Sequence, residues 1–113
     1  MNIVQYLCLL LSEEAHEVGQ RASKLSRFGS HEVQPGQPYT NIERVQQEKT
    51  DFMVVYKLLN KAAGSHDPDD FTIGSEQLNK KKEKLRKFTR LSVEQGMIGS
   101  DVEEELLVLL SRI

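Results

Sequence analysis

Apolar residues recur every three or four positions along four segments of the chain, which is the spacing of one face of an α-helix. In the first segment, Val4, Leu7 and Leu11 mark this face. The four predicted helices span residues 3–28, 41–63, 75 to 94 or 95, and about 101 to the C-terminus. Alternation typical of a β-strand never lasts more than a few residues. The pattern therefore predicts an all-α protein, most simply a four-helix bundle.

Turn residues and capping residues set the expected helix ends. Glycines follow the first three predicted helices, at Gly29, Gly64 and Gly96. Thr40 is the expected N-cap of the second helix, and Ser100 with Glu103 is typical of a capping box at the start of the fourth. Residues 29–39 and 64–74 hold all three prolines and four of the seven glycines, so both segments are expected to be loops. The short connection between the last two helices predicts antiparallel neighbours.

Length and composition favour one small domain spanning residues 1–113. Lys and Arg number 15 and Asp and Glu number 17, so no strong overall charge attracts nucleic acid or an acidic membrane. Cys8 is the only cysteine, which excludes an intramolecular disulfide and a CxxC zinc site, and we expect a buried free thiol. The apolar run at residues 3–11 has no basic flank or cleavage site and is too short to span a bilayer. We therefore expect a cytoplasmic protein without a membrane partner.

The first predicted helix carries three acidic residues, Glu13, Glu14 and Glu17, in the pattern EExxE. Successive helical residues are about 100° apart, so Glu14 lies within about 40° of Leu7 and Leu10. Glu17 lies about 60° from Glu14. Both carboxylates are thus on or beside the apolar side, and packing of that side draws them toward the interior.

The second predicted helix repeats this arrangement with Glu48 and Asp51. Glu48 lies within about 40° of Val55 and Phe52, and Asp51 lies about 60° from Glu48. A single pair with this spacing is most often a solvated helix face. Two pairs, each on the apolar side of a helix that can pack against the other, favour a metal site, because buried unpaired carboxylates are costly.

Four carboxylates that converge from two helices suit Mg²⁺, or Mn²⁺ in its place, since both ions prefer oxygen ligands. Water or substrate phosphates would complete the coordination. Without the cation, the same carboxylates would repel a triphosphate. We therefore expect phosphate binding at this place to depend on the metal.

The EExxE and ExxD motifs resemble the signature of the all-α nucleoside triphosphate pyrophosphohydrolases, the superfamily of MazG-like enzymes and dimeric dUTPases. The setting is also similar, because an apolar run precedes EExxE and the apolar segment FMVVYKLL follows ExxD. The resemblance covers about residues 3–95. It implies a MazG-like four-helix bundle completed by oligomerisation, as a homodimer or homotetramer.

The resemblance also implies an activity and a set of site residues. Members cleave the bond between the α- and β-phosphates of an NTP or dNTP, and yield the monophosphate and pyrophosphate. Carried over, the Mg²⁺ ligands are Glu14, Glu17, Glu48 and Asp51. Glu13 would orient or deprotonate the attacking water, or support the metal ligands from outside.

Basic residues near these acids are candidates for binding substrate phosphates. Arg21 and Lys24 follow the EExxE motif on nearly the same side, although Arg21 would equally form an i, i+4 pair with Glu17. The third predicted helix has seven basic and two acidic residues between positions 76 and 90. Most of this run is expected to be solvated, with Lys81 and Lys84 near the edge of its apolar side.

The sequence is also compatible with two other functions. The chain begins only a dozen residues before EExxE, whereas many members have a preceding helix that helps to form the base pocket. This difference motivates a catalytically silent nucleotide-binding or interaction protein of the same fold. The basic third helix motivates a nucleic-acid-binding protein, which its one aromatic residue and the slightly acidic chain make the weaker alternative.

Overall fold

The computed structural model describes all residues, 1–113, and is all-helical. The helices are α1 (Ile3–Phe28), α2 (Asn41–Ala62), α3 (Ser75–Glu94) and α4 (Ser100–Leu110). The all-α, four-helix prediction is confirmed, and the helix bounds differ from those expected by three residues at most. The only strand-like feature is an isolated bridge between Val33 and Thr40.

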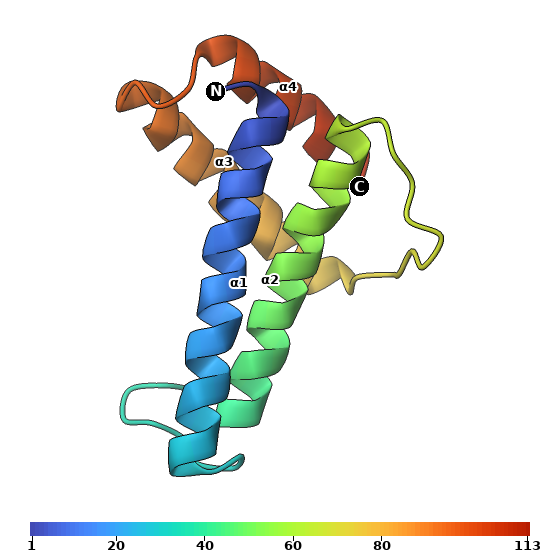
Figure 1. The fold of residues 1–113 in the computed structure, drawn as a ribbon. Helices are drawn as coiled ribbons and strands as arrows, with labels where there is room; N and C mark the ends of the chain where they lie inside the picture. The colour runs from blue at the N-terminus through green and yellow to red at the C-terminus, as the bar shows by residue number, and fades with distance from the viewer.

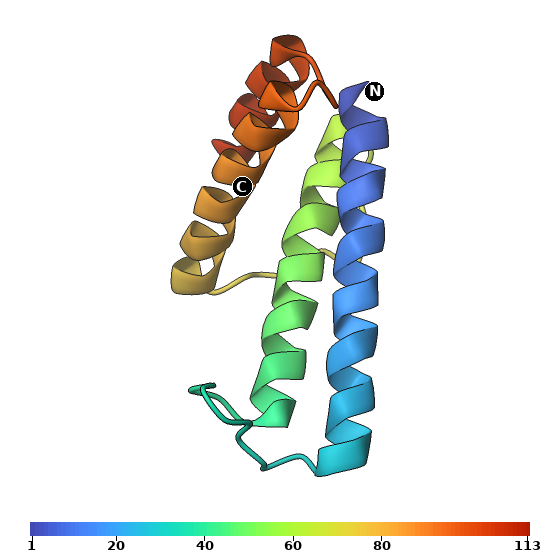
Figure 2. The same cartoon turned by 90° about the vertical axis from the view of Figure 1, so that its left-hand side faces the viewer.

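Two long helices, α1 and α2, lie antiparallel and side by side over most of their length (Figure 1). Helix α3 begins about halfway along this pair and runs toward the N-terminus of α1, and α4 folds back along α3 (Figure 2). The expected antiparallel arrangement of the last two helices is therefore confirmed. The molecule measures 43 × 35 × 22 Å along its principal axes.

Local chemistry explains the helix ends. The Thr40 side chain accepts a hydrogen bond from the Glu43 backbone, and Glu43 accepts one in return from the Thr40 amide at 3.0 Å. Gly29 ends α1 with φ +94°, a backbone conformation that favours glycine. The prediction of a capping box at Ser100 is wrong, because Ser100 is the first residue of α4 and Gly99 is its N-cap. The Glu103 carboxylate instead accepts a hydrogen bond from Arg90 at 3.0 Å.

The hydrophobic core lies at the end of the molecule where all four helices meet. It consists of Ile3, Tyr6, Leu7, Leu10, Val54, Val55, Leu58, Leu85, Ile98, Val102, Leu106 and Leu110. The buried Tyr6 hydroxyl joins α1 to α3 through Thr89 and Ser92, each at 3.2 Å. Cys8 is exposed, contrary to expectation, because α1 buries the stripe that runs through Tyr6 and Leu7 and leaves the next position outside it.

The opposite half of the α1–α2 pair has little core. The loop that joins the two helices lies at that far end (Figures 1 and 2). The loop is tied to the start of α2, where the Asn41 amide nitrogen donates to the Gly29 carbonyl at 2.9 Å and Arg44 donates to Gln34 at 3.1 Å. Residues 29–38 do not line the acidic pocket described below, whereas Tyr39, the last residue of the loop, lines an adjoining pocket with Glu48 and Asp51.

Several large apolar side chains remain exposed on α3 and α4, including Phe88, Leu91, Leu107 and Val108. The radius of gyration is 15.2 Å, compared with about 13 Å for a compact chain of this length. The chain thus leaves apolar surface uncovered on two helices. None of the helices has the length and apolar character needed to cross a membrane.

Candidate metal centre

An acidic pocket of about 500 Å³ opens where α1, α2 and α3 meet, at the edge of the hydrophobic core. Its charged lining residues are Glu13, Glu14, Glu17, Glu48, Asp51, Lys81, Lys84 and Lys87. All four predicted metal ligands, the predicted catalytic Glu13 and the two predicted lysines of α3 therefore line the same pocket. Five carboxylates against three ammonium groups leave it net negative.

Glu14 is the most deeply placed carboxylate of the pocket, with only 8% of the residue exposed. Its Oε1 atom accepts a hydrogen bond from the Lys81 ammonium group. Its Oε2 atom is buried and has no hydrogen-bond partner. Burial raises the pKa of Glu14, and the hydrogen bond from Lys81 offsets only part of that effect. A cation beside Oε2 would satisfy this oxygen.

Glu48 approaches Glu14 from α2 and shares its environment. Its Oε2 atom is likewise buried without a partner. One carboxylate oxygen each from Glu14, Glu17 and Glu48 lie within 4.8 Å of one another. Oxygens bound to one Mg²⁺ at about 2.1 Å are up to about 4.2 Å apart, so small side-chain rotations would allow the three to share an ion.

The other two predicted site carboxylates are placed differently from the sequence expectation. Glu17 is exposed rather than buried, because its position is displaced around α1 from that of Glu14, although one of its oxygens joins the cluster. Asp51 lies next to the cluster and is one-quarter exposed, and its Oδ2 atom is 3.9 Å from the Lys81 ammonium nitrogen. Burial raises the pKa of Asp51, and Lys81 opposes that effect. The Lys81 ammonium group, the most buried cation of the pocket, thus lies between a carboxylate of α1 and one of α2.

Crowding of carboxylates is strongest at Glu48. Burial, followed by the neighbouring Glu17 carboxylate and by the charges of Asp51 and Glu14, raises the pKa of Glu48 from 4.5 to about 7. Between pH 4.5 and about pH 7, Glu48 therefore binds more protons in the folded protein than in the unfolded chain. Its contribution to stability is therefore lost as the pH rises through this window.

We accordingly expect the metal-free protein to be more stable at about pH 5.5 than at about pH 7.5. The Glu48→Gln substitution should flatten this dependence, because the amide does not titrate. The measurement is urea unfolding followed by circular dichroism in EDTA at several pH values. Asp67 and Asp70, whose hydrogen bonds lower their pKa values, titrate below this window.

The matched control is Glu104→Gln, which removes an exposed carboxylate of α4 far from the pocket. It should keep the pH dependence of the wild-type protein. The expectation is contradicted if the metal-free protein becomes more stable from about pH 5.5 to about pH 7.5. It is also contradicted if the stability of Glu48→Gln depends on pH as steeply as that of Glu104→Gln.

Arg21 and Lys24, the two predicted phosphate-binding residues of α1, lie in different surroundings. Arg21 faces the site, with its Nε atom 3.9 Å from Glu48 Oε1, so its partner is on α2, and the alternative pair with Glu17 is not formed. Lys24 lies ten residues from Glu14, about 15 Å along the helix axis, and faces a separate hollow with His16. It is therefore not brought to the acidic pocket.

Arg44 was not expected near the site. It is 91% buried one helical turn before Glu48, and the charges of Glu48 and Arg21 act on it. Burial, with the nearby Arg21, lowers the pKa of Arg44. The i, i+4 spacing of Arg44 and Glu48 is the sequence signal that could have identified it.

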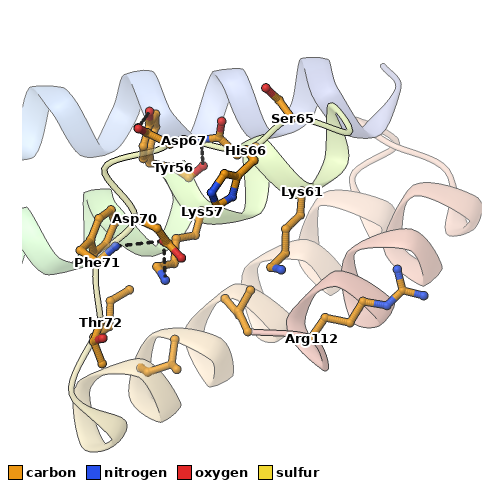
Figure 3. A pocket seen from close by; sticks show the side chains of 14 residues that line it. Tyr56, Lys57, Lys61, Ser65, His66, Asp67, Asp70, Phe71, Thr72 and Arg112 are labelled. Atoms are coloured by element: carbon orange, nitrogen blue, oxygen red, sulfur yellow. Dashed lines mark hydrogen bonds and ion pairs between the residues drawn. The ribbon is translucent and has the colours of Figure 1, made fainter.

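A second pocket of about 460 Å³ lies between α2, the 64–74 loop and the C-terminus (Figure 3). Asp67 accepts hydrogen bonds from the Tyr56 hydroxyl and from the Asp69 amide, and Asp70 pairs with Lys57 at 3.0 Å. The aspartates of this loop therefore stabilise its turn, and Gly74 is the N-cap residue of α3.

Comparison of the chain with known protein families, with curated proteins and with solved structures finds no match. The assignment of a function therefore depends on the motifs and on the geometry of the acidic pocket.

Proposed function

We propose that the protein is a Mg²⁺-dependent nucleoside triphosphate pyrophosphohydrolase, which converts an NTP or dNTP and water to the monophosphate and pyrophosphate. The observation that carries this proposal is the pair of buried, unpartnered oxygens, Glu14 Oε2 and Glu48 Oε2, which face one pocket from two helices. Leaving such oxygens without a partner costs free energy, which a bound cation would recover.

The residues present fit a hard divalent cation. Glu14, Glu17 and Glu48 would hold it, with Asp51 beside them, and the all-oxygen donor set suits Mg²⁺ or Mn²⁺ better than a softer metal. Mg²⁺ keeps open positions for water and phosphate in sites of this kind. When bound, it supplies Lewis-acid polarisation of the phosphates and a template for the substrate.

The chain's own residues then have distinct tasks. Glu13, at the exposed rim of the pocket, accepts a proton from the water that attacks the α-phosphorus. The new oxygen–phosphorus bond forms as the bond to the bridging oxygen breaks, and that oxygen leaves with pyrophosphate. Lys84 and Arg21, both beside the carboxylates, bind phosphate oxygens on which negative charge accumulates.

We also place the chain in the MazG-like fold as a homo-oligomer, either a dimer or a tetramer. The exposed apolar side chains of α3 and α4 support this, as does the small fraction of the chain that is buried, 18 of 113 residues. Phe88 and Leu91 line the acidic pocket while remaining 44% exposed. A second copy that covers them would also complete the wall of the pocket.

A catalytically silent nucleotide-binding protein of the same fold is the second candidate. The position of Lys81 favours it, because this ammonium group contacts Glu14 and lies 3.9 Å from Asp51, and so partly neutralises two of the proposed metal ligands. This candidate predicts nucleotide binding without release of pyrophosphate.

Product analysis by ³¹P NMR tests the proposed reaction. With a nucleoside triphosphate and Mg²⁺, monophosphate and pyrophosphate should appear together in equal amounts. Formation of the diphosphate and inorganic phosphate would contradict cleavage between the α- and β-phosphates.

A further inference from the structure

Lys81 differs from every other lysine of α3 in its surroundings. Only 7% of the residue is exposed, whereas Lys80 and Lys87 are solvated and pair with glutamates one turn away on their own helix. The Lys81 ammonium group reaches Glu14 on α1 and lies 3.9 Å from Asp51 on α2. It is therefore the one lysine that links all three helices around the pocket.

This single charge does not satisfy the carboxylates around it. Glu14 Oε2 and Glu48 Oε2 stay unpartnered although Lys81 is in place, and the five carboxylates of the pocket outnumber its three ammonium groups. A divalent cation beside the same oxygens would bring twice the charge. It would also be repelled by the ammonium group, since two cations within a few ångströms of each other interact strongly in a partly buried site.

We propose that Lys81 is a displaceable internal cation, which neutralises Glu14 and Asp51 in the metal-free protein and leaves them when a divalent ion binds. This inference rests on the metal site of the proposed function. Lysine suits such an exchange because its charge is compact and its four-carbon chain is flexible. Lys81 thereby lowers the affinity of the site for the metal.

Direct metal binding tests this proposal without reference to turnover. Lys81→Met should bind Mn²⁺ about tenfold or more tightly than the wild-type protein, measured by electron paramagnetic resonance or by calorimetry, because the competing charge is gone. Lys82→Met is the matched control: it removes the same charge from the adjacent position, which lines no pocket with the carboxylates and donates a hydrogen bond to the Ile113 carbonyl instead. Its Mn²⁺ affinity should equal that of the wild-type protein.

The results separate the two proposals. If the wild-type protein binds Mn²⁺ and Lys81→Met binds it no more tightly, the displacement of Lys81 is refuted while the metal site stands. If neither protein binds Mn²⁺, both the metal site and the displacement are refuted. Equal tightening in Lys81→Met and Lys82→Met would show a general charge effect, and would also overturn the role of Lys81.

A second measurement uses the unaltered chain and so does not depend on how the variant folds. In EDTA, acetylation of Lys81 by a water-soluble acetylating reagent should be slow, because its amino group is buried against Glu14. Saturating Mg²⁺ should speed the reaction at Lys81 about tenfold, measured by mass spectrometry, while the exposed Lys49, which does not line the pocket, serves as the internal reference. An unchanged rate at Lys81 would refute the displacement.

Discussion

The Glu17→Gln substitution is expected to lower the rate of pyrophosphate release by about a thousandfold, the scale of effect seen when one group that stabilises the reacting charge is removed. Glu17 contributes a carboxylate oxygen to the cluster with Glu14 and Glu48. The amide keeps the shape of the side chain and removes the charge. Because Glu17 is exposed, the variant should unfold at nearly the same temperature as the wild-type protein.

Two further variants make this expectation specific. Asp51→Asn, on the other helix, should cause a loss of similar size because Asp51 lines the same pocket. Glu104→Gln, which neutralises an exposed carboxylate of α4, should retain full activity. Substantial activity in Glu17→Gln or Asp51→Asn would count against the assignment of the carboxylates. A folded but silent Glu104→Gln would mean that net charge, and not the site, controls the rate.

Metal dependence of nucleotide binding is the second large effect. A nucleoside triphosphate analogue with a methylene group between the α- and β-phosphorus atoms should bind at least about a hundredfold more tightly in Mg²⁺ than in EDTA. The cause is electrostatic, because the net negative pocket repels a triphosphate until a cation is present. Calorimetric titration measures this difference, and the analogue prevents turnover during the experiment.

The same titration distinguishes the nucleic-acid alternative. Binding through the basic surface of α3 would be independent of Mg²⁺ and of the four carboxylates, and would weaken steeply with salt. Glu48→Gln should abolish the effect of Mg²⁺ on binding of the analogue. If the analogue binds equally well in EDTA, or if Glu48→Gln leaves the metal effect intact, the phosphates do not bind through the proposed centre.

Local signals explain why the helices were predictable from the sequence. Gly29 ends α1 in a conformation that favours glycine, and Thr40 begins α2 with a reciprocal cap. Such interactions involve residues three or four positions apart, so the sequence contains them in full. The same holds for the side of α1 on which Glu14 lies, because helical periodicity alone determines it. Burial of Glu14 was therefore predictable, while the neighbouring Glu17 proved to be exposed at the edge of that side.

Contacts between helices were less accessible to sequence analysis. The partner of Lys81 depends on where α3 crosses the α1–α2 pair, and the partner of Arg21 depends on the alignment of α1 with α2. Periodicity gives the direction of a side chain but not what lies opposite it. Ser100 shows the same limit, since Glu103 is drawn into a contact with Arg90 on another helix instead of capping its own.

The lysines of α3 illustrate how tertiary position divides residues that look alike in sequence. Lys80 and Lys81 are adjacent and chemically identical, yet one is solvated and the other is buried between three helices. A basic run of this kind is usually a solvated surface, and for most of its members that prediction is confirmed. The exception follows from the position of Lys81 on the packed side of α3.

Release of pyrophosphate from a panel of NTPs and dNTPs, measured in Mg²⁺, in Mn²⁺ and in EDTA, tests the central claim most directly. The account predicts release from at least one nucleotide in the presence of either metal, with the monophosphate as co-product, and no release in EDTA. Release that continues in EDTA would contradict the role of the carboxylates around Glu14 and Glu48. Absence of release from every nucleotide with both metals would contradict the proposed reaction, and would favour the silent nucleotide-binding protein.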